Sequence, residues 1–491
     1  MNQLRRVLGW LRCPPYPRLA GLLVLAPALA VAALLALAAA RVVPAQWTPS
    51  EREFLGPLNA AYSLQAPSWQ LATIAVLAGL ALAAFAVWSD RQVSQRSRAS
   101  EDGLRLPLSP RNIMRQTRGV FAGEVTVTVV IPAHNEEHRL QRTLDAALAQ
   151  DPAPRRVIVV ADNCTDRTVE IAHAAGAEVV ETVGNTHKKA GALNQVLPSV
   201  LEDCGDNDLV MVLDADTVLE PGFLDAVVGH FTADRGLMAC CGLFYGERGH
   251  GLLGLLQRNE YTRYAREIAR RRGKVYVLTG TSSVFRSHAL RMVARRRGVS
   301  LPGVQGDVYD TTALTEDNEL TLALRSLGAL MVSPGACRVE TELMPNLRAL
   351  WQQRIRWHRG ALENLGAYGM SFATVLYWMQ QLSITYGALA LWGYLGLMSF
   401  TSLAVSHWVW FPFWLGVGGI FAVERVVTVW RSGWRARLVA ALLIPELLYS
   451  ALLDLIQVVG IVEIALARTA VWRHVPPPAP SGPTARDLQE A

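Results

Sequence analysis

Hydrophobic and polar positions divide the chain into apolar ends and a more polar centre. Residues 19–40 carry no charge and are long enough to span a bilayer, and a second apolar segment follows at residues 68–89. This pair predicts a transmembrane hairpin. A signal peptide is the alternative for the first segment, but its length and the second apolar segment favour a retained helix.

Towards the other end, no charged residue occurs from position 364 to 423, which is too long for one span. Residues 438–467 are also apolar, although they contain Glu446, Asp454 and Glu463. Acidic side chains are costly inside a membrane, so this last segment either spans or lies in the interface. We therefore expect two or three C-terminal helices.

The centre shows a different pattern, in which short β-branched runs alternate with helical stretches. The runs cover residues 125–131, 157–161 and 209–213, and helices are expected at residues 139–150 and 166–175. Short buried strands that alternate with helices are typical of an α/β fold with a parallel sheet.

Composition and charge agree with a membrane protein. Hydrophobic residues make up 51% of the chain and charged residues 18%, below the roughly 25% of soluble domains. The net charge is +6, but arginines cluster beside the apolar segments, which fits the positive-inside rule and not a nucleic-acid-binding stripe. The six cysteines include no C-x-x-C pair, so neither a disulfide framework nor a zinc site is indicated.

These patterns predict seven segments along the chain. The first three are a cytoplasmic N-terminus (1–18), a transmembrane hairpin (19–89) and an irregular juxtamembrane linker (90–121). They are followed by an α/β domain (122–345), interfacial helices (346–372), C-terminal membrane or interface helices (373–467) and a Pro-rich tail (468–491). The arginines place the α/β domain in the cytoplasm.

Acidic residues follow the predicted strands. Glu136, Asp162, Asp214 and Asp216 should meet at one edge, because ligands of open parallel sheets bind beyond the carboxyl ends of the strands. Converging carboxylates need a cation, and oxygen ligands suit Mg²⁺ or Mn²⁺. An Asx turn or a helix cap is the alternative for Asp214.

Three further motifs are candidates for the same site, and each has a structural alternative. Lys189 could reach a diphosphate or lie in a solvated loop. Asp317, in Thr315-Glu316-Asp317, could be a general base, or this triplet could simply cap a helix.

The third motif lies on one predicted helix face. Gln353, Arg356 and Trp357 could bind an acceptor and a pyrophosphate, or Arg356 and Trp357 could anchor a helix at a membrane surface.

Along the chain, the motifs are V-I-P-A-H-N-E-E, Asp162, K-A-G-A-L-N, D-A-D, T-E-D and Q-x-x-R-W. The order of these motifs resembles that of processive family 2 membrane glycosyltransferases. These are the cellulose, hyaluronan and poly-N-acetylglucosamine synthases. The resemblance implies a GT-A fold, with a Rossmann-like mixed sheet that binds a nucleotide sugar, and inverting transfer. It assigns the donor to Ala133, Glu136, Asp162, Lys189 and Asp214, and the metal to Asp216 with Asp214. It makes Asp317 the base, with Glu316 beside it, and it assigns the acceptor and pyrophosphate to Gln353, Arg356, Trp357, Thr279 and Gly280.

The function expected from this resemblance is transfer of a sugar, N-acetylglucosamine as a first choice, from a UDP-sugar to a growing glycan or a lipid-linked acceptor. The alternative is non-processive transfer of one sugar to a polyprenyl phosphate or another lipid. The expected partners are the donor, the acceptor and membrane lipids, without nucleic acid, in a multi-pass bacterial cell membrane.

Overall fold

The computed structural model describes residues 98–116, 124–271, 273–404, 409–410 and 412–468, with scattered positions between 20 and 95. Most of the predicted transmembrane hairpin therefore lies outside the described residues, as does nearly all of the Pro-rich tail. Both remain predictions.

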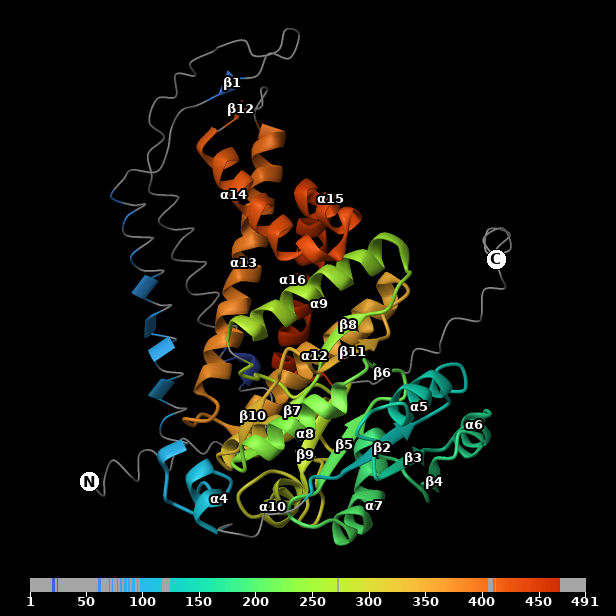
Figure 1. Ribbon diagram of the computed structural model, residues 1–491. Coiled ribbons are helices and arrows are strands. Elements are labelled where there is room, and N and C mark those ends of the chain that lie inside the picture. Colours follow the sequence, from blue (N-terminus) through green and yellow to red (C-terminus); the bar gives the residue numbers. More distant parts are fainter. Residues whose placement is uncertain are drawn as a thin grey trace, which may run out of the picture.

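A seven-stranded mixed sheet forms the centre of the described chain (Figure 1). Its strands, in spatial order, are β10 (Leu330–Val332), β7 (Leu237–Cys241), β9 (Ser282–Arg286), β5 (Leu209–Leu213), β2 (Val127–Ala133), β3 (Arg156–Ala161) and β4 (Glu178–Glu181). The three predicted strands are confirmed as β2, β3 and β5, which are parallel neighbours. The strand β9 runs antiparallel to both β5 and β7, so the sheet is mixed, as the family resemblance implied.

Helices cover both faces of this sheet, because successive side chains of each strand point to opposite faces. Val129 of β2 belongs to one hydrophobic cluster, and Val130, the next residue, belongs to another. The helices in and around these clusters are α5 (Leu140–Leu148), α6 (Thr168–Ala174), α7 (Lys188–Asp203), α8 (Phe223–Ala233), α10 (Ser287–Arg296) and α11 (Glu316–Ser326). The helices predicted at residues 139–150 and 166–175 are confirmed as α5 and α6, with slightly shorter bounds.

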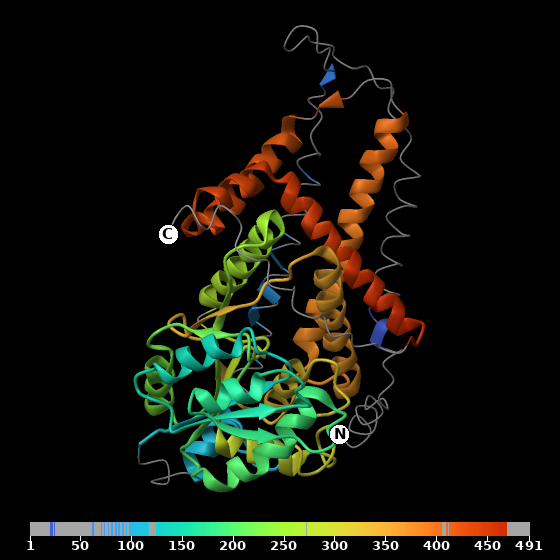
Figure 2. The same ribbon diagram turned by 90° about the vertical axis from the view of Figure 1, so that its right-hand side faces the viewer.

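A small sheet and a group of longer helices lie beside the large sheet (Figure 1). The strands of the small sheet are β6 (Val218–Leu219), β11 (Arg338–Thr341) and β8 (Leu243–Gly246). The longer helices are α9 (Gly251–Arg270), α12 (Leu347–Tyr368), α13 (Val375–Ala404), α14 (Pro412–Thr428), α15 (Trp434–Leu442) and α16 (Ile444–Ala465), with a 3₁₀ turn, η1 (Trp430–Ser432), between α14 and α15. Figure 2 shows α13 and α16 extending away from the sheet. A two-residue bridge pairs β1 (Ala61–Tyr62) with β12 (Val409–Trp410).

Two predictions for the flanking regions were incomplete. The linker at residues 90–121 is not wholly irregular, because it contains α4 (Pro110–Gln116). Within the described part of residues 373–467 there are four α-helices, α13 to α16, where two or three membrane or interface helices were expected. Gly433, at φ 92°, separates η1 from the short helix α15, and Leu443, at φ 54°, separates α15 from α16.

Among the described residues, α16 is the helix that is long and apolar enough to cross a membrane. Two of its three acidic residues have basic partners: Glu463 pairs with Arg359 of α12 at 3.0 Å, and Glu446 pairs with Arg263 of α9. These ion pairs explain how acidic residues are accommodated in an apolar helix. Length and composition alone define this class of helix, which also includes buried helices of soluble proteins.

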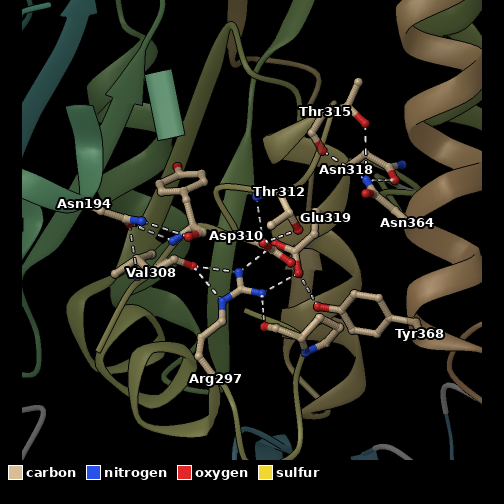
Figure 3. Close-up of polar contacts among 12 residues, drawn as sticks. Asn194, Arg297, Val308, Asp310, Thr312, Thr315, Asn318, Glu319, Asn364 and Tyr368 are labelled. Carbon is tan, nitrogen blue, oxygen red and sulfur yellow. Dashed lines mark hydrogen bonds and ion pairs between the residues drawn. The ribbon is translucent and has the colours of Figure 1, made fainter. Parts of the chain in front are cut away.

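A buried ion pair holds α11 to the end of α10. Arg297 and Glu319 form a bidentate pair, with Nη2 2.6 Å from Oε2, and both side chains are almost fully buried. Arg297 also donates to the carbonyls of Pro302 and Val308, and the Tyr368 hydroxyl donates to Glu319 at 2.5 Å (Figure 3). Every charged atom of the pair therefore has a partner.

We expect Arg297→Met to lower the free energy of unfolding by about 3–5 kcal/mol, because it leaves the Glu319 carboxylate buried without its cation. The matched control is Arg167→Met, which removes an exposed pair with Glu170 and should cost less than about 1 kcal/mol. Denaturant unfolding of both purified variants measures the difference. Equal costs would contradict the role assigned to the buried pair.

Candidate active site

The antiparallel strand β9 places a glycine beside the end of β5. The amide of Asp214, the first residue after β5, donates to the carbonyl of Thr281 at 3.1 Å. The preceding residue, Gly280, therefore lies at the carboxyl edge of the sheet. This position agrees with the expectation that Thr279 and Gly280 belong to the site.

Three charged side chains meet around Gly280. A Cβ atom at this position would lie 3.3 Å from Lys189 Nζ, 3.4 Å from Asp214 Oδ2 and 3.4 Å from Asp317 Oδ2. The carboxylates come from the end of β5 and the first turn of α11, and the lysine comes from the first turn of α7. A cleft at this point is lined by Lys189, Thr279, Gly280, Tyr309, Glu316 and Asp317, among others. The structure thus brings together six residues that the sequence proposed from four separate motifs.

Lys189 compensates the negative charge of this cluster. Its ammonium pairs with Asp214, lies 3.4 Å from Glu316 Oε1 and donates to the Gly280 carbonyl at 3.5 Å. Burial opposes the charged form, but the attraction of Asp214 and Glu316 outweighs it and holds the pKa of Lys189 above its ordinary value. Lys189 is therefore a partly buried, ion-paired cation on a helix, and the alternative of a solvated loop is wrong.

The two acidic residues at the start of α11 differ in their ionisation. Burial raises the pKa of Glu316, but Lys189 and Arg356 more than offset this effect, so its pKa lies below the ordinary value. Burial, with the charge of Glu316, raises the pKa of Asp317. When the pKa values of two neighbouring acids shift in opposite directions, one acid is suited to stay ionised and the other is suited to exchange a proton.

Backbone amides hold the Asp317 carboxylate from both sides. Oδ1 accepts from the Asn318 amide at 2.7 Å, and Oδ2 accepts from the Gly280 amide at 3.0 Å. Thr315 precedes α11, but its side chain makes no capping hydrogen bond. The capping alternative for the T-E-D motif is therefore not what the structure shows.

A second group of carboxylates surrounds Asp216. Burial and the charge of Asp216 raise the pKa of Glu136 to about 8. Burial also raises the pKa of Glu342 to about 7, against the attraction of Arg139, whose Nη1 lies 2.7 Å from Oε2 of Glu342. Sequence reasoning missed Glu342 and Arg139. Glu342 directly follows β11, so the rule that polar residues follow strands could have found it once β11 was recognised.

Asp216 and Asp214 are the candidate metal ligands of this region. Within the described residues, no set of three or more His, Cys, Asp or Glu side chains is placed to hold one ion. Mg²⁺ commonly binds through one or two carboxylates together with substrate phosphates. Asp216 and Asp214 fit that smaller donor set, although Asp214 also pairs with Lys189.

Asp162, on the opposite side of β2, is largely occupied by internal contacts. Its Oδ1 accepts hydrogen bonds from Thr182 and Asn185 at 2.8 Å and from Asn163 at 3.0 Å. Its backbone amide donates to the carbonyl of Ala133, the last residue of β2, at 2.8 Å. Ala133 and Asp162 are therefore neighbours, and Oδ2 is the oxygen of Asp162 left for a ligand.

The helix α12 carries Gln353, Arg356 and Trp357 to the same region. Arg356 is close enough to Glu316 to lower the pKa of that carboxyl. The Gln353 Oε1 atom is buried and has no hydrogen-bond partner in the described structure, as expected of a group that awaits a ligand. Arg354 lies over the Trp357 ring at 4.4 Å and forms a bidentate pair with Glu260, with both distances 2.9 Å. Sequence reasoning did not single out Arg354.

Comparisons with known proteins show which proteins this chain resembles. The family model described as "Glycosyltransferase like family 2" matches residues 124–360. Poly-beta-1,6-N-acetyl-D-glucosamine synthase of Staphylococcus aureus is 25% identical over 245 residues, which are 49% of this chain and 55% of the relative. The Staphylococcus epidermidis enzyme of that name is 26% identical over 249 residues. The chain thus spans about half the length of these curated relatives.

Among solved structures, a mannosyltransferase from Pyrobaculum calidifontis in complex with GDP-Man and Mn²⁺ is 17% identical, with a TM-score of 0.43, over 79% of this chain and 98% of the other. Glucosyl-3-phosphoglycerate synthase from Mycobacterium tuberculosis, with Mn²⁺ and UDP, is 20% identical, with a TM-score of 0.33. The match covers 54% of this chain and 85% of the other. Residues 124–360 thus match a glycosyltransferase family 2 model, as the sequence resemblance predicted, and the sheet within them is mixed.

Proposed function

We propose that this chain transfers a sugar, with inversion, from a UDP-sugar to a hydroxyl of a growing glycan or a lipid-linked acceptor. The observation that carries the proposal is the meeting of Lys189, Asp214 and Asp317 around Gly280. This arrangement combines a partly buried cation, for a leaving diphosphate, with a carboxylate of raised pKa, for an attacking hydroxyl. N-acetylglucosamine is the first choice of sugar, because the curated relatives are named as synthases of its polymer.

Each proposed step uses a residue described above. The acceptor hydroxyl attacks the anomeric carbon of the donor, and its proton passes to Asp317. The bond from that carbon to the diphosphate oxygen breaks, and UDP leaves with the electron pair. Lys189 stabilises the negative charge that develops on the diphosphate, and Glu316 stays ionised and helps to hold Lys189 in place.

A divalent cation completes the proposed donor site. Asp216, with Asp214, would hold Mg²⁺ or Mn²⁺, and the bound ion would neutralise charge on the leaving diphosphate. Burial is the main cause of the raised pKa values of Glu136 and Glu342, and the charge of Asp216 adds to it, so a cation beside Asp216 would be favourable there. Ala133 and Asp162, one strand further along, would contact the uridine.

The acceptor site is proposed to lie along α12. This helix packs against α16, the apolar helix described above, and α13 is free of charged residues over its whole length. We therefore place the catalytic domain at the cytoplasmic face of a bacterial membrane, beside a lipid or glycan acceptor. A ladder of products from purified protein and UDP-N-acetylglucosamine would support polymer synthesis, whereas a single lipid-linked sugar would support the non-processive alternative.

Asp317→Asn should reduce turnover by about 10²–10⁴-fold, because an amide cannot take the proton of the acceptor. UDP affinity should stay close to that of the wild type, since the donor contacts come from other elements. UDP release and UDP binding by calorimetry measure the two effects. Glu340→Gln, which removes an outlying carboxylate, is the control. Loss of UDP binding in Asp317→Asn would instead make Asp317 a structural residue.

Chelation of divalent cations should abolish turnover, and added Mg²⁺ or Mn²⁺ should restore it. Asp216→Ala should remove the response to added cation while leaving the protein folded, since Asp216 is not part of a hydrophobic cluster. Sugar transfer across a cation titration measures the effect, with circular dichroism as the check on folding. Full activity in excess chelator would remove the cation from the proposal.

Trp357→Ala should reduce sugar incorporation more than it reduces UDP release, because hydrolysis of the donor by water needs no stacking surface. A paired assay of incorporated sugar and released UDP measures the ratio. Trp430→Ala is a matched control, because Trp430 also has an arginine, Arg437, over its ring at 4.9 Å but lies on η1. Normal incorporation by Trp357→Ala would favour an anchoring role for this tryptophan.

A further inference from the structure

One buried carboxamide joins α12 to the start of α11. Asn364 is 4% exposed, and its Nδ2 atom lies 3.0 Å from the Thr315 carbonyl, 3.2 Å from Thr315 Oγ1 and 3.1 Å from Asn318 Oδ1 (Figure 3). Thr315 and Asn318 are the residues on either side of the Glu316-Asp317 pair. Asn364 therefore bridges both flanks of the proposed base.

The two helices also make unusually close steric contact at this point. Gly360 lies one turn before Asn364 on α12, and a Cβ atom there would lie 2.3 Å from Thr315 Oγ1 and 2.6 Å from Thr315 Cγ2. No side chain fits into that space without displacing Thr315. The glycine permits the approach, and Asn364 supplies the polar contacts across it.

The contact reaches the reacting carboxylate through the backbone. The Asn318 amide donates to Asp317 Oδ1 at 2.7 Å, so the position of Asn318 determines where one oxygen of Asp317 lies. A second contact between the same helices, from Tyr368 to Glu319, lies further along and touches neither flank of Asp317. Asn364 and Tyr368 therefore hold the same helix pair, but only the first acts next to the base.

We propose that Asn364 is a positioning residue, which fixes the Asp317 carboxylate relative to the acceptor-binding residues that α12 also carries. The proposal rests on the proposed role of Asp317 as general base. The base and the residues Gln353, Arg356 and Trp357 then behave as one unit, because a single helix supplies the acceptor contacts and the anchor of the base. Small displacements of a reacting group can cost about 10²-fold in rate, so such an anchor matters for turnover.

The test compares Asn364→Ala with Tyr368→Phe, since each removes buried hydrogen bonding between α11 and α12. Turnover, the KM for UDP-N-acetylglucosamine, UDP affinity and the melting temperature are measured for both. Asn364→Ala should lower kcat by about 10- to 100-fold with UDP affinity nearly unchanged. Tyr368→Phe should lower the melting temperature while kcat stays near that of the wild type. Equal effects of the two variants on kcat would overturn the proposal.

Asn318→Ala gives the same test from the other side of the hydrogen bond, and it decides the question if Asn364→Ala does not fold. It keeps the amide that binds Asp317 but removes the side chain that Asn364 holds, so kcat should again fall while UDP affinity is kept. Unchanged kcat in this variant would overturn the proposal. Wild-type protein without UDP release, or an Asp317→Asn variant with normal turnover, would instead overturn the proposed function.

Discussion

The ion pair between Lys189 and Asp214 is the contact on which the arrangement of the site depends. Asp214, Glu316 and Asp317 converge there from two elements, and buried carboxylates at such distances repel one another unless a cation lies among them. The first turn of α7 supplies that cation. The same helix is fixed further along, because Asn194 accepts from the amides of Val308 and Tyr309 and donates to the Tyr309 carbonyl (Figure 3). The hydrogen bonds of Asn194 thus fix the position of α7, the helix that carries the Lys189 ammonium.

Charge is distributed unevenly across the site. Around Gly280, Lys189 compensates the carboxylates, and Glu316 and Asp317 differ in pKa as a result. Around Asp216, burial raises the pKa values of Glu136 and Glu342, the charge of Asp216 adds to the effect, and Arg139 opposes it at Glu342. A cation beside Asp216 would favour the ionised forms of these carboxylates, and the family resemblance assigns the metal to Asp216.

Much of the sheet and of the site could be predicted from the sequence, because the parallel strands β2, β3 and β5 are short apolar runs that end in acidic residues. Periodicity could not reveal that β9 runs antiparallel, since strand direction depends on tertiary pairing. Glu342 escaped prediction because β11 pairs in the small sheet, with strands distant in sequence. Arg354 was missed because helical spacing shows only which residues share a face. It could not show that the Arg354 guanidinium covers the Trp357 ring.

The contact of Arg354 with Trp357 limits how this tryptophan could serve the proposed acceptor site. The guanidinium of Arg354 lies 4.4 Å from the centre of the indole ring and covers one of its faces. Two hydrogen bonds from Arg354 to Glu260 hold the guanidinium in that position. An acceptor sugar that stacks on Trp357, as proposed, would therefore have to use the opposite face of the ring.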